Sequence, residues 1–164
     1  MPTITSLATV ARGHSNRGAL PRVVSVDIDF AAAATANGTA LVATDIIQAI
    51  TFEADTIILA AGITAKTADT GANADMRVDL GTGEDADIFV DGFDWPGAAA
   101  GDEARTMGLG GGYKVGADDT LDLTIAAATT VATAGTLTVW AVCVPFDEDR
   151  TKIVADEVDR DQLA

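Results

Sequence analysis

The chain has 164 residues, of which 48% are hydrophobic, and this is enough for one domain with its own core. Ten Lys and Arg against twenty-five Asp and Glu give a net charge of −15, which disfavours binding to nucleic acid because phosphate contacts require basic groups. The single cysteine, Cys143, excludes an intramolecular disulfide and any multi-cysteine metal site, and we expect a buried thiol. No apolar run has the length of a membrane span or of a signal peptide, so we expect a soluble protein made in the cytoplasm.

The charge is unevenly distributed along the chain. Residues 1–22 contain Arg12, Arg17 and Arg22 and no acidic residue, so they carry +3 while the remaining 142 residues carry −18. We expect residues 1–21 to form an extended N-terminal arm. The arginines either dock on an acidic surface of a partner or belong to a flexible polar leader, and the sequence leaves both possibilities open.

After the arm, apolar residues alternate with polar ones in a series of short segments, which indicates strands. The predicted strands cover residues 22–30, 45–54, 56–67, 74–81, 87–93, 113–116, 119–127 and 135–146. Between the first two, the Ala-rich segment 31–40 with its Asn-Gly pair predicts a turn rather than a helix, although a short helix at 31–36 stays open. Gly62 is a candidate for a bulge or kink inside its strand.

Eight strands separated by turn signals, without a long helix, predict an all-β fold: a single-domain β-sandwich, most consistent with an eight-stranded jelly roll. The sandwich domain is expected at 22–146, with a long Gly- and Ala-rich loop at 96–112. The last strand becomes apolar on both faces toward its end, so it should be central or covered. A charged C-terminal tail at 147–164 is expected to be either disordered or an added turn or strand.

The stretch "DLGTGEDADIFVDGFDW" (79–95) is the main candidate for a chemical site. Glu84, Asp85 and Asp87 could contribute oxygen ligands to a calcium ion, but their spacing is not that of an EF-hand, and a solvated hairpin turn is the favoured interpretation. "GTGEDA" (81–86) also matches a dinucleotide-binding loop in letters, but it precedes a strand instead of a helix and is acidic where phosphates would bind.

The remaining motifs give no catalytic site. "GLGGGYK" (108–114) lacks the Gly-Lys-Ser/Thr ending of a phosphate-binding loop, and His14 is the only histidine available for a metal or a catalytic dyad. With 5% aromatic residues the chain also has little material for stacking sugars. Trp95 is either an exposed anchor for a partner or a cap on the edge of the core, and the cap is the favoured interpretation. We therefore predict a protein that is not an enzyme, needs no metal or cofactor, and works through surface contact.

Three segments carry a family resemblance: "VVSVDIDFAAAATANGTALVATDIIQAITFEADTIILAAG", "DLGTGEDADIFVDGFDW" and "GTLTVWAVCVPF". Together, over residues 22–146, the chain resembles small virion proteins of tailed bacteriophages. The resemblance implies a capsid decoration or cement protein, a jelly-roll domain that is often trimeric and sits on the outer surface of the head, bound to the major capsid protein. A carbohydrate- or receptor-binding jelly roll of a phage fibre or tail is the alternative. The tail after Phe146 has no role that the resemblance explains.

Overall fold

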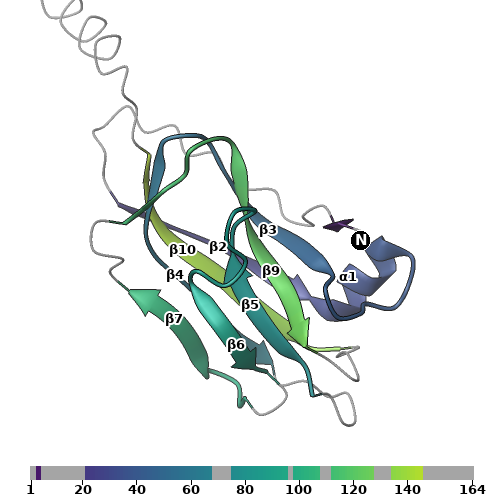
Figure 1. Cartoon of the computed structure of the whole chain (residues 1–164). Coiled ribbons are helices and arrows are strands. Elements are labelled where there is room, and N and C mark those ends of the chain that lie inside the picture. The colour runs from purple at the N-terminus through teal and green to yellow at the C-terminus, as the bar shows by residue number, and fades with distance from the viewer. Residues whose placement is uncertain are drawn as a thin grey trace, which may run out of the picture.

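Two β-sheets face each other in the computed structural model of the chain (Figure 1). The structure describes residues 3–4, 21–67, 75–95, 98–107, 112–127 and 134–145. Most of the expected arm and all of the expected tail therefore lie outside the described residues. Within those residues, no helix is long and apolar enough to cross a membrane.

One sheet, called sheet A, contains β1, β3, β9, β5 and β6 in that order, and the other, sheet B, contains β2, β10, β4 and β7, with the short β8 paired to β4. Every pair is antiparallel except the parallel pair of β1 with β3. The bounds in sheet A are β1 Thr3–Ile4, β3 Ile46–Phe52, β5 Arg77–Gly81, β6 Val90–Asp94 and β9 Asp119–Ala127. Those in sheet B are β2 Arg22–Asp29, β4 Thr56–Thr67, β7 Glu103–Met107, β8 Tyr113–Lys114 and β10 Thr136–Pro145. The predicted all-β sandwich is confirmed, while the jelly roll stays a prediction.

The core lies between the two sheets, where the inward-facing residues of both meet, and burial of each Val, Leu, Ile, Phe or Met side chain there contributes about 1.5–3 kcal/mol. The predicted alternation is confirmed most clearly in β10, where every second residue from Leu137 to Cys143 is buried. The inward-facing residues include Val78 and Leu80 of β5, Leu121, Leu123 and Ile125 of β9, and Leu137, Val139, Ala141 and Cys143 of β10. Strand β10 lies between β2 and β4, as its two apolar faces predicted.

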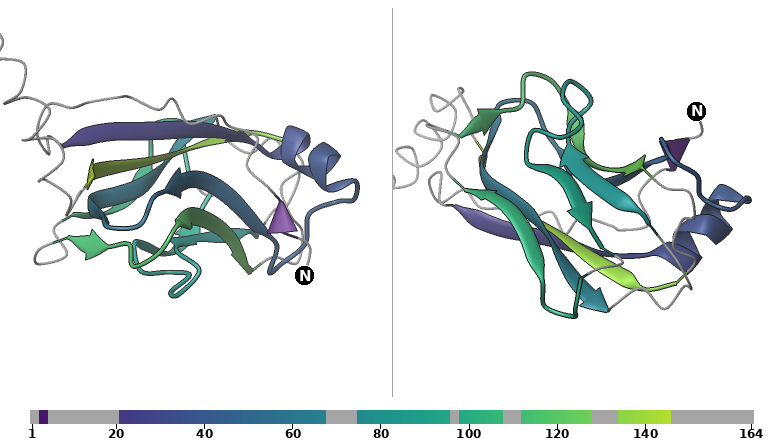
Figure 2. Two further views of the ribbon diagram at one scale, coloured as in Figure 1. Left: turned by 90° about the horizontal axis from the view of Figure 1, so that it is seen from above. Right: turned by 60° about the horizontal axis from the view of Figure 1, so that its bottom comes forward.

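Residues 30–37 form a helix, α1 (Phe30–Asn37), where the sequence favoured a turn. Asp29 caps its N-terminus by accepting a hydrogen bond from the Ala32 amide at 2.9 Å, and the Ala-rich run then has the highest helix propensity available. Phe30 and Ala33 are buried and attach the helix to one end of the sandwich (Figure 2).

Two further expectations need correction. The expected loop at 96–112 contains strand β7, which pairs with β4 from Ala60↔Met107 to Thr64↔Glu103. Its sequence EARTM has no apolar alternation because it is an edge strand with its charged side chains exposed. The bulges of β4 fall beside Thr136/Leu137 and Val142/Cys143, not at Gly62, which pairs regularly with Trp140.

Candidate interaction surfaces

The acidic turn, residues 82–89, joins β5 to β6, which form the predicted hairpin. The Thr82 amide donates to the Asp85 carbonyl at 2.8 Å, and Gly81 is required next to it because a Cβ there would lie 2.0 Å from the same oxygen. The hydroxyl of Tyr113 lies 3.1 Å from Thr82 Oγ1 and donates to Glu84 at 3.3 Å. The turn is thus fixed by its own backbone and by one tyrosine.

The carboxylates of this turn point into solvent instead of toward a common centre. Glu84, Asp85 and Asp87 are all exposed, and the hydrogen bond and the negative charge of Asp85 raise the pKa of Asp87. Among the residues that the structure describes, no three acidic, His or Cys side chains are grouped so that they could hold a metal ion. The geometry therefore favours the solvated hairpin turn over the calcium site.

Trp95 lies in the core and not on a partner-binding surface. Its side chain is 0% exposed, its ring centroid is 4.5 Å from that of Phe30, and its Nε1 donates to the Thr67 carbonyl at 3.2 Å. The structure thus corrects the interpretation of Trp95 as an exposed anchor and places it as a core cap at the end of β6. Of the three arginines of the arm, Arg22 is exposed at the start of β2, and Arg12 and Arg17 lie outside the described residues.

The outer face of sheet B carries a group of apolar side chains that we call the apolar face. In β10, Trp140, Val142 and Val144 alternate with buried inward-facing residues, so they point away from the core, and all three are half-buried. Val23 of β2 pairs with Val142 and is 70% exposed. The apolar face consists of Val23, Ile57, Leu59, Trp140, Val142 and Val144.

Trp140 is held in place by a close approach of the backbone. A Cβ at Gly62 would lie 2.8 Å from Cζ2 of Trp140, 2.8 Å from Cβ of Arg105 and 2.7 Å from the Ala104 carbonyl. The indole therefore lies across Gly62, beside the side chain of Arg105. Sequence reasoning missed this tryptophan as a surface residue, although its position between Val139 and Ala141 in an alternating strand indicates that it faces outward.

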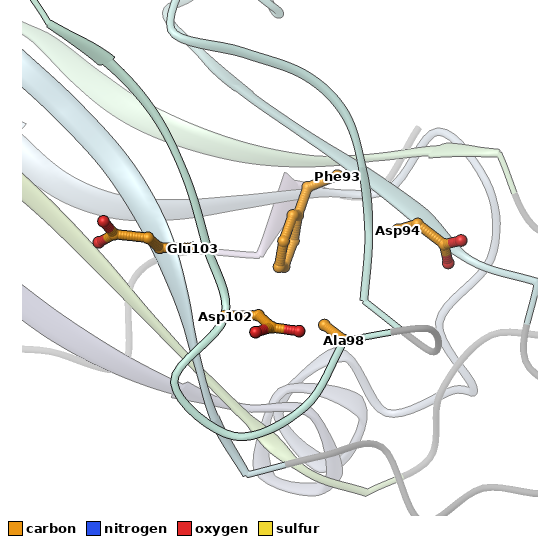
Figure 3. Close-up of a pocket in the computed structure, with 5 residues that line it drawn as sticks. All are labelled: Phe93, Asp94, Ala98, Asp102 and Glu103. Carbon is orange, nitrogen blue, oxygen red and sulfur yellow. The ribbon is translucent and has the colours of Figure 1, made fainter.

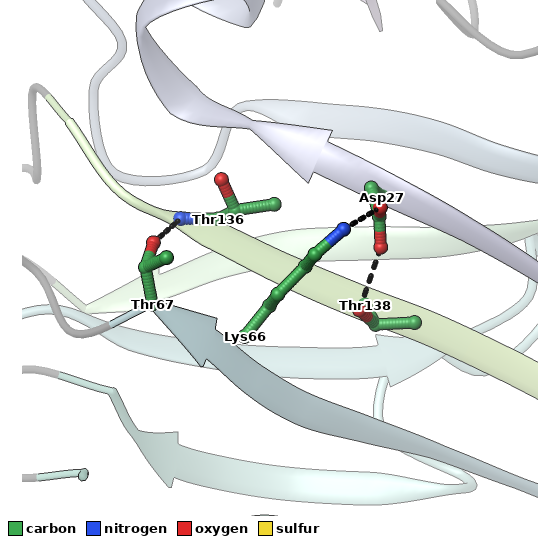
Figure 4. Close-up of polar contacts among 5 residues, drawn as sticks. All are labelled: Asp27, Lys66, Thr67, Thr136 and Thr138. Carbon is green, nitrogen blue, oxygen red and sulfur yellow. Dashed lines mark hydrogen bonds and ion pairs between the residues drawn. The ribbon is translucent and has the colours of Figure 1, made fainter. Parts of the chain in front are cut away.

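The other end of the same outer face is polar (Figure 4). Lys66 of β4 forms an ion pair with Asp27 of β2, and Thr138 of β10 donates to the second oxygen of Asp27 at 2.7 Å. The hydrogen bond from Lys66, and then that from Thr138, lower the pKa of Asp27. The Thr136 amide donates to Thr67 Oγ1 at 2.8 Å. The outer face of sheet B thus changes from polar and paired to apolar along its strands.

The two sheets differ in charge. Among the residues that the structure describes, the strands of sheet B carry four basic and three acidic side chains, a net charge of +1. The strands of sheet A and the acidic turn carry eight acidic side chains and Arg77, a net charge of −7. Among the described strands, sheet B is therefore nearly neutral, whereas sheet A with the acidic turn is strongly negative.

The hollows at the described surface are open depressions. One of about 370 Å³ lies beside β6 and the start of β7 and has three carboxylates around its rim (Figure 3). It is lined by Phe93, Asp94, Ala98, Asp102 and Glu103. Another, of about 450 Å³, is lined by the small residues Ala34, Thr35, Gly38, Thr39 and Ala40 at the end of α1. Neither brings together the donor and acceptor groups of a small-molecule site.

No family model and no curated protein match the sequence. Chains of solved structures match the fold, and two of them have TM-scores above 0.5. A chain of the cyanophage Pam1 capsid asymmetric unit is 17% identical with a TM-score of 0.58, and the match covers 84% of this chain and 94% of that one. A chain of the capsid of Ralstonia phage GP4 is 15% identical with a TM-score of 0.58, covering 90% of this chain and 100% of that one. The resemblance to phage virion proteins is confirmed at the level of the fold.

Proposed function

We propose that this chain is a structural protein of a phage virion and acts as a capsid decoration or cement protein on the outside of the head. The observation that carries the proposal is the end-to-end match of its sandwich to chains from two phage capsids. The match covers 94% and 100% of the two neighbouring chains, so it is not confined to one part of either. Surface contact, rather than catalysis, is the work that this chain would perform.

The strand pairing supports a jelly roll as the finer description of the fold. Leaving aside the two-residue strands β1 and β8, the first long strand pairs with the last, the second with the last but one, and so on inward. These pairs are β2–β10, β3–β9, β4–β7 and β5–β6. A long antiparallel hairpin rolled into two sheets has this order.

The apolar face is the surface that would dock on the major capsid protein. Exposed apolar side chains gain free energy when an interface removes them from water, and Val23, at 70% exposed, lies on this face together with the half-buried Trp140. The acidic turn and sheet A would then face solvent, where their negative charge needs no compensation. Several copies in one oligomer, for which a trimer is our expectation, would add their contacts through effective concentration.

Two matched variants test this orientation on heads that lack the chain, made by a deletion mutant of the phage that encodes it. Among the described residues, Val23 and Val42 are the large hydrophobic side chains that are clearly exposed, at 70% and 55%, and Val42 lies in the loop between α1 and β3. Val23→Asp places a charge on the apolar face, and Val42→Asp introduces the same charge elsewhere. We expect wild type and V42D to co-sediment with the heads and V23D to bind at least tenfold more weakly, as loss of about 1.4 kcal/mol implies.

The outcome that contradicts the docking face is normal binding by V23D, or a defect in V42D alone. If the wild-type protein itself fails to bind the heads, the decoration role is wrong. A positive result on a glycan array would then favour the receptor-binding alternative.

A further inference from the structure

The short strand β1 forms the edge of sheet A next to β3. It lies at the end of the sandwich opposite to the start of β2 (Figure 2). Thr3 pairs with Ile46 and Ile4 with Ile47, in the only parallel pair among the described strands. In the structure β1 lies near α1, whereas β2 begins at the opposite end of the molecule (Figure 2). Strand β1 and the start of β2, which follow each other in the sequence, therefore lie at opposite ends of the sandwich (Figure 2).

Residues 5–21 join β1 to β2, and this connection has many residues. Seventeen residues can span up to about 56 Å when fully extended. The eight residues of β2, which run along the sandwich from one end to α1, cover only about 26 Å. The connection can thus reach about twice the length of β2 and also further than β4, whose twelve residues cover about 40 Å, so it could deliver Thr3–Ile4 to the β3 edge of a neighbouring copy.

Charge favours delivery to a neighbour. Two copies of this chain repel each other because everything after residue 22 carries −18, whereas residues 1–22 carry +3. The positive charge of residues 1–22 is therefore attracted to the acidic body of a second copy, which lowers the repulsion between two copies that exchange their arms.

We propose that copies of this chain exchange their N-terminal arms, so that the β3 edge at Ile46–Ile47 accepts Thr3–Ile4 of a second copy. The pairing is the same as within one chain, so the exchange needs no new contacts beyond those of the β1–β3 ladder. It is reciprocal in a dimer and cyclic in a trimer. The exchange concerns the assembly of the chain with itself and does not depend on binding to a phage head.

Cysteine pairs in a background of Cys143→Ala test the exchange, since directly paired Cα atoms in neighbouring strands lie within the range that a disulfide bridges. One protein carries only Thr3→Cys and the other, with an affinity tag, only Ile46→Cys. The two are mixed, unfolded, refolded together and oxidised. We expect disulfide-linked dimers that contain one chain of each kind on a non-reducing gel. The control acceptor is Thr51→Cys, on the same strand but away from Thr3.

A doubly substituted chain, T3C with I46C, reports on the pairing itself. Cross-linked monomers from this protein, together with no mixed dimers from the two single variants, would overturn the exchange, and so would equal cross-linking to T51C. A second variant lacks residues 2–20 and keeps the acceptor edge intact. Light scattering should show that this deletion has lost the oligomer of the wild type, and an unchanged mass would contradict the proposal. Head binding is measured separately, so a failure of the exchange is distinguishable from a failure of the decoration role.

Discussion

Replacing Trp95 by alanine removes the largest buried side chain in the described part of the molecule. The loss has two parts: the transfer and cavity cost of a fully buried aromatic ring, which is about 3–5 kcal/mol, and the orphaned Thr67 carbonyl, which loses a donor worth about 1 kcal/mol. The variant also leaves one face of Phe30 without the ring that packs against it at 4.5 Å. We expect Trp95→Ala to lower the free energy of unfolding by at least about 3 kcal/mol, which corresponds to a decrease of about 6–20 °C in Tm.

Urea unfolding followed by far-UV circular dichroism measures this loss, and Trp140→Ala is the matched control. Trp140 is the second of the two tryptophans and is half-buried on the outer face, so its truncation should cost less than half as much. A loss below about 1 kcal/mol for W95A would refute the placement of Trp95 in the core and restore the interpretation as an exposed anchor.

Two other substitutions test the packing and the charge of the sheets. Gly62→Ala should destabilise the protein by about 1–3 kcal/mol because its Cβ would collide with Ala104 and Trp140, whereas Gly116→Ala, with nothing within 4 Å, should be close to neutral in the same thermal scan. Burial raises the pKa of Asp122 above its ordinary value of 3.8, although a hydrogen bond from Thr120 opposes the shift. The stability contributed by the protonated carboxyl is complete below the ordinary pKa and is lost as the pH rises through the raised value. We therefore expect Asp122→Asn to have a higher Tm than wild type at pH 7 and no advantage near pH 3; an advantage that persists at pH 3 would contradict this account.

The strands that pack against the core could be predicted from the sequence, since burial imposes the alternation that the sequence shows. The segments 56–67 and 119–127 have the predicted bounds, and alternating residues of 119–127 such as Leu121, Leu123 and Ile125 are buried against the other sheet. Strand β7 could not be predicted in this way, because an edge strand owes its existence to hydrogen bonds with β4, some forty residues away. Helix α1 begins at the N-terminal cap Asp29, which as part of an alternating segment was indistinguishable from another solvent-facing strand residue.

Of the candidate surfaces, too, one could be predicted from the local sequence and the other depends on strand pairing between distant residues. The exposed acidic turn follows from its composition, whereas the apolar face is assembled from β2, β4 and β10, and only their pairing brings Val23 next to Val142. Trp95 is a residue whose burial could not be derived from its local sequence. Its neighbours in the chain suggest a loop, but contacts with Phe30 and Thr67, both distant in sequence, bury it.

Arg22 and Cys143 lie opposite each other where β2 begins and β10 ends. Both segments that flank the sandwich are therefore attached to neighbouring strands at the same end of sheet B. A short linker could join these two points and new termini could be opened at an exposed turn, which makes the domain suitable for circular permutation. Because Cys143 pairs with Arg22, an enzyme or an antigen genetically fused after β10 would be attached close to the start of β2, where the N-terminal arm joins the sandwich.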